Sequence, residues 1–82
     1  MNYTCTLDRL PAGSSACIKS LRTEGIRRRR LLDLGFVPGA HITALQIGPW
    51  GDPVAYGIRG AVIALRNEDA AGIYIERDSS HG

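Results

Sequence analysis

Apolar and polar residues alternate in several short stretches of this chain, which is the pattern of half-buried β-strands. In the stretch HITALQI (41–47), Ile42 and Ala44 fall on one face, and Thr43, Leu45 and Ile47 fall on the other. Similar patterns predict five further strands, at residues 2–7, 14–21, 53–58, 61–65 and 72–77. Proline and glycine are concentrated between the strands, at residues 8–13, 37–40 and 48–53, which predicts tight turns there.

One stretch is predicted to be a short α-helix, from about residue 24 to residue 34. Arginine and leucine are good helix formers, no proline interrupts them, and Gly35 stands where a glycine commonly ends a helix. Pro38 and Gly39 then suit the central positions of a type II turn. Residues 67–70 (NEDA) predict a one-turn helix with Asn67 as its N-cap.

Length and composition predict one small domain. The chain has 82 residues, of which 44% are hydrophobic and 22% are charged, as is typical of a globular protein. Short strands at close spacing with one helix predict a mainly β fold, a small antiparallel β-barrel of five to six strands. We expect the domain at residues 1–77 and a disordered tail at 78–82. No apolar stretch approaches the length of a membrane span, so we expect a soluble, cytoplasmic protein.

Positive charge is concentrated in one place. The net charge is +2, but Arg27–Arg30 alone contribute four positive charges, so the rest of the chain is slightly acidic. Successive helical residues are about 100° apart, and four in a row therefore cannot share one side of the helix. On a helical wheel the first two arginines flank the leucines, whereas Arg29 and Arg30 face away. These two form either a solvated helix face or a contact surface for an acidic partner.

Residues that could carry catalysis or bind a metal are few. The two histidines, His41 and His81, have no recognisable catalytic partner, and no phosphate-binding glycine loop is present, so an enzyme is not expected. Cys5 and Cys17 do not form a CxxC pair; they are expected as two buried small side chains, with a disulfide as the alternative. No ligand spacing predicts a metal site within the chain, which leaves weak or intermolecular transition-metal binding as the alternative.

Four segments of the chain together resemble the FeoA family. They are LDRLPAG (7–13), RRRLLDLGFVPGA (28–40), GPWGDPVAYGIRG (48–60) and AVIALRNEDAAGIYIE (61–76). FeoA-like proteins are small SH3-like barrels associated with bacterial ferrous iron uptake. The resemblance implies the same fold here and a partner, FeoB, which is a membrane transporter with a GTPase domain.

The resemblance also implies what kind of protein this is. It would be a cytosolic, non-enzymatic accessory of the transporter, a monomer or weak homo-oligomer, touching the membrane only through its partner and binding no nucleic acid. Trp50 lies in the 48–53 loop, where a lone tryptophan more often folds over the end of a barrel; left exposed, it would be an interface anchor. We place the contact on the helix, the turn after it and this loop, that is, on Arg29, Arg30, Gly35, Pro38, Gly39, Trp50 and Asp52.

Two alternative functions remain open. A similar domain ends the DtxR-like metal-dependent repressors, so a metal-responsive regulatory module is the first alternative. A small basic nucleic-acid-binding barrel is the second. It is less favoured, because aromatic residues are not interleaved with the basic ones as a base-stacking surface requires.

Overall fold

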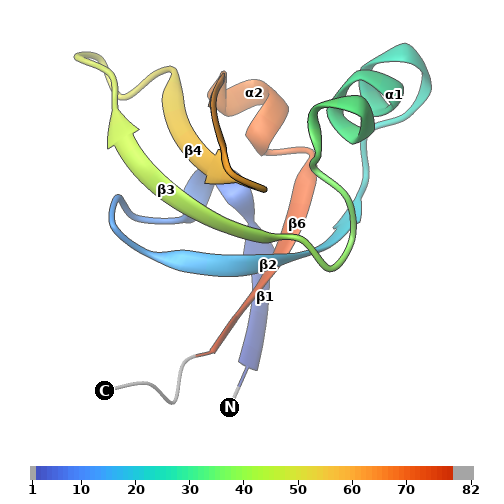
Figure 1. Ribbon diagram of the computed structural model, residues 1–82, viewed down its shortest axis with the longest axis horizontal. Coiled ribbons are helices and arrows are strands. Elements are labelled where there is room, and N and C mark those ends of the chain that lie inside the picture. The colour runs from blue at the N-terminus through green and yellow to red at the C-terminus, as the bar shows by residue number, and fades with distance from the viewer. Residues whose placement is uncertain (1, 79–82) are drawn as a thin grey trace.

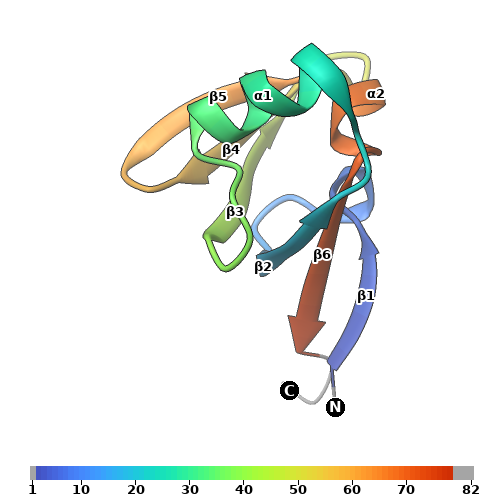
Figure 2. The same ribbon diagram turned by 90° about the vertical axis from the view of Figure 1, so that its right-hand side faces the viewer.

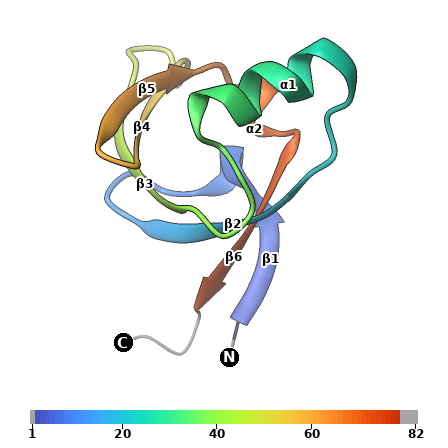
Figure 3. The same ribbon diagram turned by 45° about the vertical axis from the view of Figure 1, so that its right-hand side comes forward.

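A computed structural model describes residues 2–78, whose strands form one antiparallel sheet that curls into a barrel (Figures 1 and 3). The order across the sheet is β1-β6-β2-β3-β4-β5, so β1 and β5 are its two edges. The mainly β fold of six short antiparallel strands agrees with the prediction. The strands are β1 (Asn2–Thr6), β2 (Ser15–Leu21), β3 (His41–Ile47), β4 (Val54–Ile58), β5 (Ala61–Leu65) and β6 (Ile73–Asp78).

Three short helical segments complete the domain: η1 (Leu7–Arg9), α1 (Gly25–Leu34) and α2 (Asn67–Ala70). Helix α1 lies along the rim of the barrel beside β5 (Figure 2). It ends as predicted at Gly35, which has a φ of +111° and donates its N–H to the Leu32 carbonyl at 3.0 Å. A residue with a side chain would be strained in this left-handed conformation, which explains the glycine.

The core follows the alternation that the sequence shows. On β3, Ile42 and Ala44 are fully buried, whereas Leu45 and Ile47 remain close to half exposed. The same pattern holds on β4, whose residues alternate between buried and half-buried positions. Seventeen buried hydrophobic side chains form one cluster, the largest of them being Tyr56, Phe36, Leu7, Ile18, Ile42, Ile73 and Ile75.

Three strands depart from a simple period of two. On β3, the pairing with β4 shifts between Ala44 and Gln46, so Ile47 lies opposite the buried Val54 and not on the face of Thr43, where the alternation places it. The first predicted strand ends at Thr6, because Leu7 begins the 3-10 turn η1 and is fully buried from there. On β2, the pairing with β6 shifts between Ile18 and Ser20, so Leu21 rather than Ser20 points into the core. Such a bulge inverts the alternation beyond it.

The two ends of the described chain lie side by side on β1 and β6, at the far end of the barrel from α2 (Figure 1). Strand β6 extends to Asp78, the first residue of the predicted tail. The other residues of that tail, 79–82, lie outside the described residues. No helix between residues 2 and 78 is long and apolar enough to cross a membrane.

Candidate partner-binding surface

Helix α1 rests on the barrel through a narrow stripe. Leu31 is buried and Leu32 half-buried, whereas Leu34 is 42% exposed. The side chains directed toward the barrel are those of Arg27, Arg30, Leu31 and Leu34, which follow the i, i+3, i+4, i+7 spacing of one helical face. Half of this face is charged, so α1 packs loosely and leaves a hollow beneath it.

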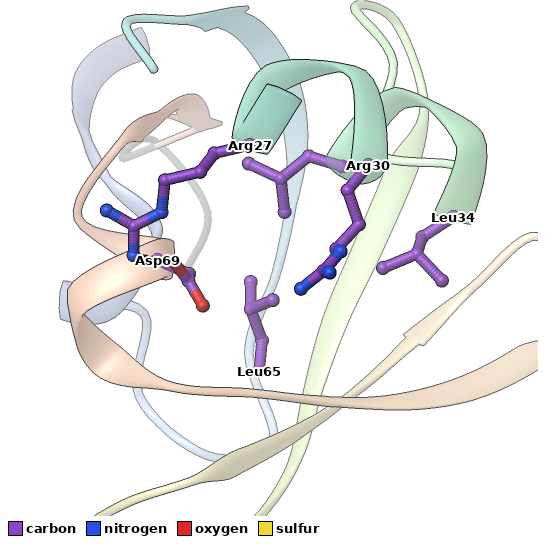
Figure 4. A pocket seen from close by; sticks show the side chains of 6 residues that line it. Arg27, Arg30, Leu34, Leu65 and Asp69 are labelled. Atoms are coloured by element: carbon purple, nitrogen blue, oxygen red, sulfur yellow. Dashed lines mark hydrogen bonds and ion pairs between the residues drawn. The ribbon is translucent and has the colours of Figure 1, made fainter. Parts of the chain in front are cut away.

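This hollow, the α1–β5 groove, lies between α1 on one side and β5 and α2 on the other (Figure 4). Its volume is about 100 Å³, well below the roughly 300–1,000 Å³ of typical small-molecule sites. Mixed charged and apolar walls around a small groove suit the side chains of a protein partner better than a cofactor. The residues that line it are Arg27, Arg30, Leu31, Leu34, Leu65 and Asp69.

Arg27 closes one end of the α1–β5 groove. Its guanidinium donates to Asp69 Oδ1 at 2.8 Å and to Glu68 Oε2 at 3.3 Å (Figure 4 shows the pair with Asp69). The Arg27 side chain is 63% exposed, so each pair contributes about 1 kcal/mol or less. These ion pairs therefore add little to the stability of the fold, but they link α1 to α2 and fix where the two helices lie relative to each other.

Arg30 does not face away from the barrel, and the helical-wheel prediction is wrong for this residue. Its guanidinium extends into the α1–β5 groove beside Leu34 and Leu65 (Figure 4). The wheel assumes that the helix touches the barrel along its whole leucine stripe. Leu31 is buried and Leu32 packs half-buried against the core, but beneath Leu34 the barrel leaves a hollow, and the Arg30 side chain enters it.

The remaining two arginines lie on the other side of α1. Arg28 donates to the Leu21 carbonyl at 3.2 Å. Arg29, one of the predicted contact residues, borders a shallow hollow with Gly25 and Leu32, so the structure does not bring it together with Arg30 in the α1–β5 groove. The arginine run therefore divides between two sides of the helix and does not form the continuous basic face that general nucleic-acid binding requires.

The loop between β3 and β4, residues 48–53, presents Trp50 at its tip. The Gly48 N–H donates to the Pro53 carbonyl at 2.9 Å, which closes the base of the loop. Trp50 is 90% exposed, so the expectation that it folds over the barrel end is wrong. That end is already closed by α2 and η1, whose Ala70 and Leu7 are fully buried. The ring is therefore exposed, as the alternative prediction of an interface anchor requires.

Asn67 ties this Trp50 loop to α2. Its backbone N–H donates to Asp52 Oδ1 at 2.8 Å, and its Nδ2 donates to the Gly51 carbonyl at 2.8 Å. The prediction of Asn67 as N-cap is wrong, because the N-cap is Arg66 and Asn67 is the first residue of the helix. The Asp52 carboxylate supplies the capping oxygen from a distant loop, a contact that no local pattern reveals.

Two of the predicted contact segments lie at opposite ends of β3. The Pro38–Gly39 turn precedes the strand and is closed by a hydrogen bond of 3.0 Å from the Ala40 N–H to the Val37 carbonyl. The Trp50 loop follows the strand. The seven residues of β3 separate the two by roughly 20 Å. Helix α2 instead brings the Trp50 loop and the α1–β5 groove together, since it binds Asp52 through Asn67 and Arg27 through Asp69. Sequence reasoning misses this role of α2.

A buried ionisable group lies beneath the surface. Tyr56 is 1% exposed, and its hydroxyl donates to the Leu7 carbonyl at 3.5 Å. Burial raises the pKa of Tyr56 to about 12, with smaller contributions from the negative charges of Asp8 and Asp52. The phenol therefore stays neutral across the physiological range and serves the core.

The cysteines are too far apart to form a disulfide. Cys5 is opposite Ile75 and Cys17 is opposite Glu76, on the two strands that flank β6. Two strand spacings, about 9.6 Å, exceed the roughly 7 Å that a disulfide can bridge, and consecutive β6 residues point to opposite faces. Both thiols are free, and Cys17 is exposed, so its predicted burial is wrong.

Three side chains of metal-binding types lie in a row across neighbouring strands. Cys17 faces His41 in the β2–β3 register and Glu76 in the β2–β6 register, and all three are exposed. No three His, Cys, Asp or Glu side chains among residues 3–77 come together as a ligand set. His81 lies outside the described residues.

Comparison with known proteins identifies relatives of the whole domain. A family model described as the FeoA domain matches residues 5–77. An Fe(2+) transport protein A/Fe(2+) transporter FeoB fusion protein from Porphyromonas gingivalis is 43% identical over 75 residues, or 92% of this chain. The chain spans only 9% of that protein's length.

Solved structures share the fold. Iron(II) transport protein A from Clostridium thermocellum has a TM-score of 0.83 and 39% identity, covering 87% of this chain and 44% of its own. FeoA from Stenotrophomonas maltophilia, described as an SH3 domain protein and complexed with zinc, has a TM-score of 0.77 and 29% identity, covering 88% and 94%. The predicted SH3-like fold is thereby confirmed. A manganese-dependent transcriptional repressor is 13% identical (TM-score 0.80, covering 92% of this chain and 42% of its own), which shows a shared fold alone.

Proposed function

The chain belongs to the FeoA family of ferrous iron transport, and we propose that it is a non-enzymatic accessory protein that binds and regulates a FeoB-type transporter. The Porphyromonas gingivalis relative carries this proposal, because a segment 43% identical to the chain shares one polypeptide with a FeoB transporter there. Fusion holds two modules at high effective concentration, which is useful when they contact each other. On this proposal the chain acts in the cytoplasm and meets the membrane through the transporter.

Two features support a protein contact at the α1–β5 groove and the Trp50 loop. Trp50 exposes 90% of its surface on a loop that hydrogen bonds hold in place, so little conformational entropy is lost when a partner covers the ring. Arg30 adds a positive charge beside the apolar Leu34 and Leu65. Tryptophan and arginine are both enriched among the residues that contribute most to binding at interfaces.

Ferrous iron uptake and co-purification from the native cell test the proposal together. Deletion of the chain should lower uptake or alter its regulation, and tagged protein should co-purify with the transporter. Trp50→Ala should lower co-purification at unchanged protein level. Tyr3→Ala is the matched control, since Tyr3 is also exposed but lies on β1, far from the loop. Unchanged uptake after deletion, with no co-purification, would refute the proposal.

A metal-responsive regulatory module is the second candidate. The zinc complex of the Stenotrophomonas maltophilia FeoA and the fold shared with a metal-dependent repressor favour it. Calorimetric titration of tag-free protein with Fe²⁺ and Zn²⁺ discriminates between the two. Stoichiometric binding would favour the second candidate, and its absence would dismiss it.

A further inference from the structure

Strand β5 is joined to β4 by a hairpin that fixes the direction of its backbone groups. The hairpin has two loop residues, Arg59 and Gly60, with φ of 51° and 82°, which are the left-handed values of a type I′ turn. Ile58 and Ala61, which flank such a turn, exchange both of their backbone hydrogen bonds. From Ala61 onward, every second residue of β5 therefore bonds to β4.

The alternate residues of β5, Val62 and Ala64, do not bond to β4 and leave the other edge of this strand unpaired. The N–H and C=O groups of Val62 and Ala64 point away from β4, because hydrogen-bonded and non-bonded pairs alternate along an antiparallel ladder. No strand pairs with β5 on that side, and within residues 2–78 no hydrogen bond outside the ladder uses these groups. Val62 is 70% exposed, and β5 carries neither proline nor charge to block pairing.

The two faces beside this edge differ in chemistry. Leu65 points to the inner face and lines the α1–β5 groove, where Arg30 lies. Ala64 points to the outer face and lines an uncharged hollow at the base of the Trp50 loop. The other residues of this hollow are Gln46, Ile47, Gly48, Pro49, Pro53 and Ala55.

Positive charge surrounds the edge. Arg59 precedes β5, Arg66 follows it, and both are exposed. Among the side chains of residues 3–77 the only ion pairs are those of Arg27 with α2, so Arg30, Arg59 and Arg66 have no acidic partner in that range. A segment added at this edge would therefore meet positive charge at both ends and in the α1–β5 groove.

We propose that the β5 edge takes up an acidic, extended segment of the transporter as a seventh strand. This inference rests on the proposed function and names the chemistry of the contact. Hydrogen bonds to Val62 and Ala64 would hold the added backbone, as in other cases of strand addition. Alternate side chains of the segment would be acidic, toward Arg30, and apolar, toward the outer hollow.

A second copy of this chain fits the edge less well. Antiparallel pairing of two β5 strands would bring Arg59 of each copy close to Arg66 of the other. Like charges placed opposite each other across strands are destabilising. The charges that favour an acidic segment therefore also oppose self-association along β5.

Hydrogen exchange of ¹⁵N-labelled chain, free and saturated with the purified full-length transporter, tests the inference. We expect the amides of Val62 and Ala64 to exchange at least about tenfold more slowly in the complex, because strand addition bonds these two N–H groups. The Ile63 amide, already bonded to β4, should change much less. A complex that forms without protecting Val62 and Ala64 would overturn the inference and leave the proposed function standing. Absence of any complex would overturn both.

Paired variants test the charge and the hydrogen bonds separately. Arg30→Glu should weaken transporter binding about tenfold or more, whereas Arg29→Glu, on the other side of α1, should change it less than threefold. Ala64→Pro removes an outward N–H and should weaken binding, whereas Ala64→Thr keeps it and should not. If Ala64→Pro fails to fold, the arginine pair decides. Equal effects of the two arginine variants would contradict the inference.

Discussion

At the scale of single residues, Tyr56 shows how the surface and the core are connected. Its ring is buried at the centre of the barrel, and its hydroxyl is held by the Leu7 carbonyl of η1. Part of the rise in its pKa comes from Asp52, the residue that caps α2 from the Trp50 loop. One carboxylate therefore influences both the core phenol and the candidate surface.

Alkaline pH should destabilise the fold through Tyr56. Its pKa is about 12 in the folded chain and near 10 in an unfolded one, so the folded state holds the proton more tightly. Its contribution to stability is complete below pH 10 and is lost as pH rises from 10 to 12. The loss is at most roughly 3 kcal/mol, at ~1.4 kcal/mol per pKa unit. Urea unfolding at pH 8, 10 and 11.5 measures it, and Tyr56→Phe should remove this component.

Residue positions are predictable from sequence where the environment is local. Alternation alone places Ile42 and Ala44 together on one face of their strand, and that face is the buried one; the position of Gly35 after the leucines predicts the end of the helix. The positions of Arg30 and Trp50 cannot be predicted in this way. That of Arg30 depends on how α1 packs on the barrel, and that of Trp50 depends on which elements close the end of the barrel. Both are tertiary properties without a local signal.

At the scale of elements, α1 depends on few contacts. Leu31→Ala should lower the free energy of unfolding by about 2–3 kcal/mol, because Leu31 is 4% exposed. Leu34→Ala, at 42% exposure on the same helix, should cost less than about 1 kcal/mol. Denaturant unfolding followed by circular dichroism compares the two. Similar losses from both would mean that α1 is not held mainly through Leu31.

The link between α2 and the Trp50 loop is testable through Trp50, the only tryptophan of the chain. Asn67→Ala removes the hydrogen bond to the Gly51 carbonyl. The fluorescence anisotropy of Trp50 should then decay faster, with a stability loss of only about 1 kcal/mol. Glu68→Ala, at the next position of α2, is the control and should leave the decay unchanged. An unchanged decay in Asn67→Ala would show that this bond does not hold the loop.

Elements are recovered well from the sequence because alternation and turn residues are local signals. The helix at 24–34 and the strands at 53–58 and 61–65 are found within one residue of their predicted bounds. The bulges on β2 and β3 are missed, since they arise from pairing with β6 and β4. The cap of α2 is missed for the same reason, because Asp52 reaches it from 15 residues away.

At the scale of the whole molecule, a curled sheet with two open edges carries one small, basic helix on its rim. The barrel supplies stability through its single hydrophobic cluster, and the rim supplies the candidate contacts. Helix α2 organises that rim, because it joins α1 through Arg27 and the Trp50 loop through Asn67. The fold class follows from the sequence, whereas this arrangement requires contacts over 16 to 42 residues of chain.

An equilibrium titration of the full chain against a FeoB-type transporter in lipid nanodiscs tests the central claim most directly. It should be made with the transporter free of nucleotide, with GDP and with a GTP analogue. We predict saturable binding in at least one of these states, weakened about tenfold or more by Trp50→Ala and little changed by Tyr3→Ala. Absence of saturable binding in all three states would contradict the claim that this chain is a partner of the transporter.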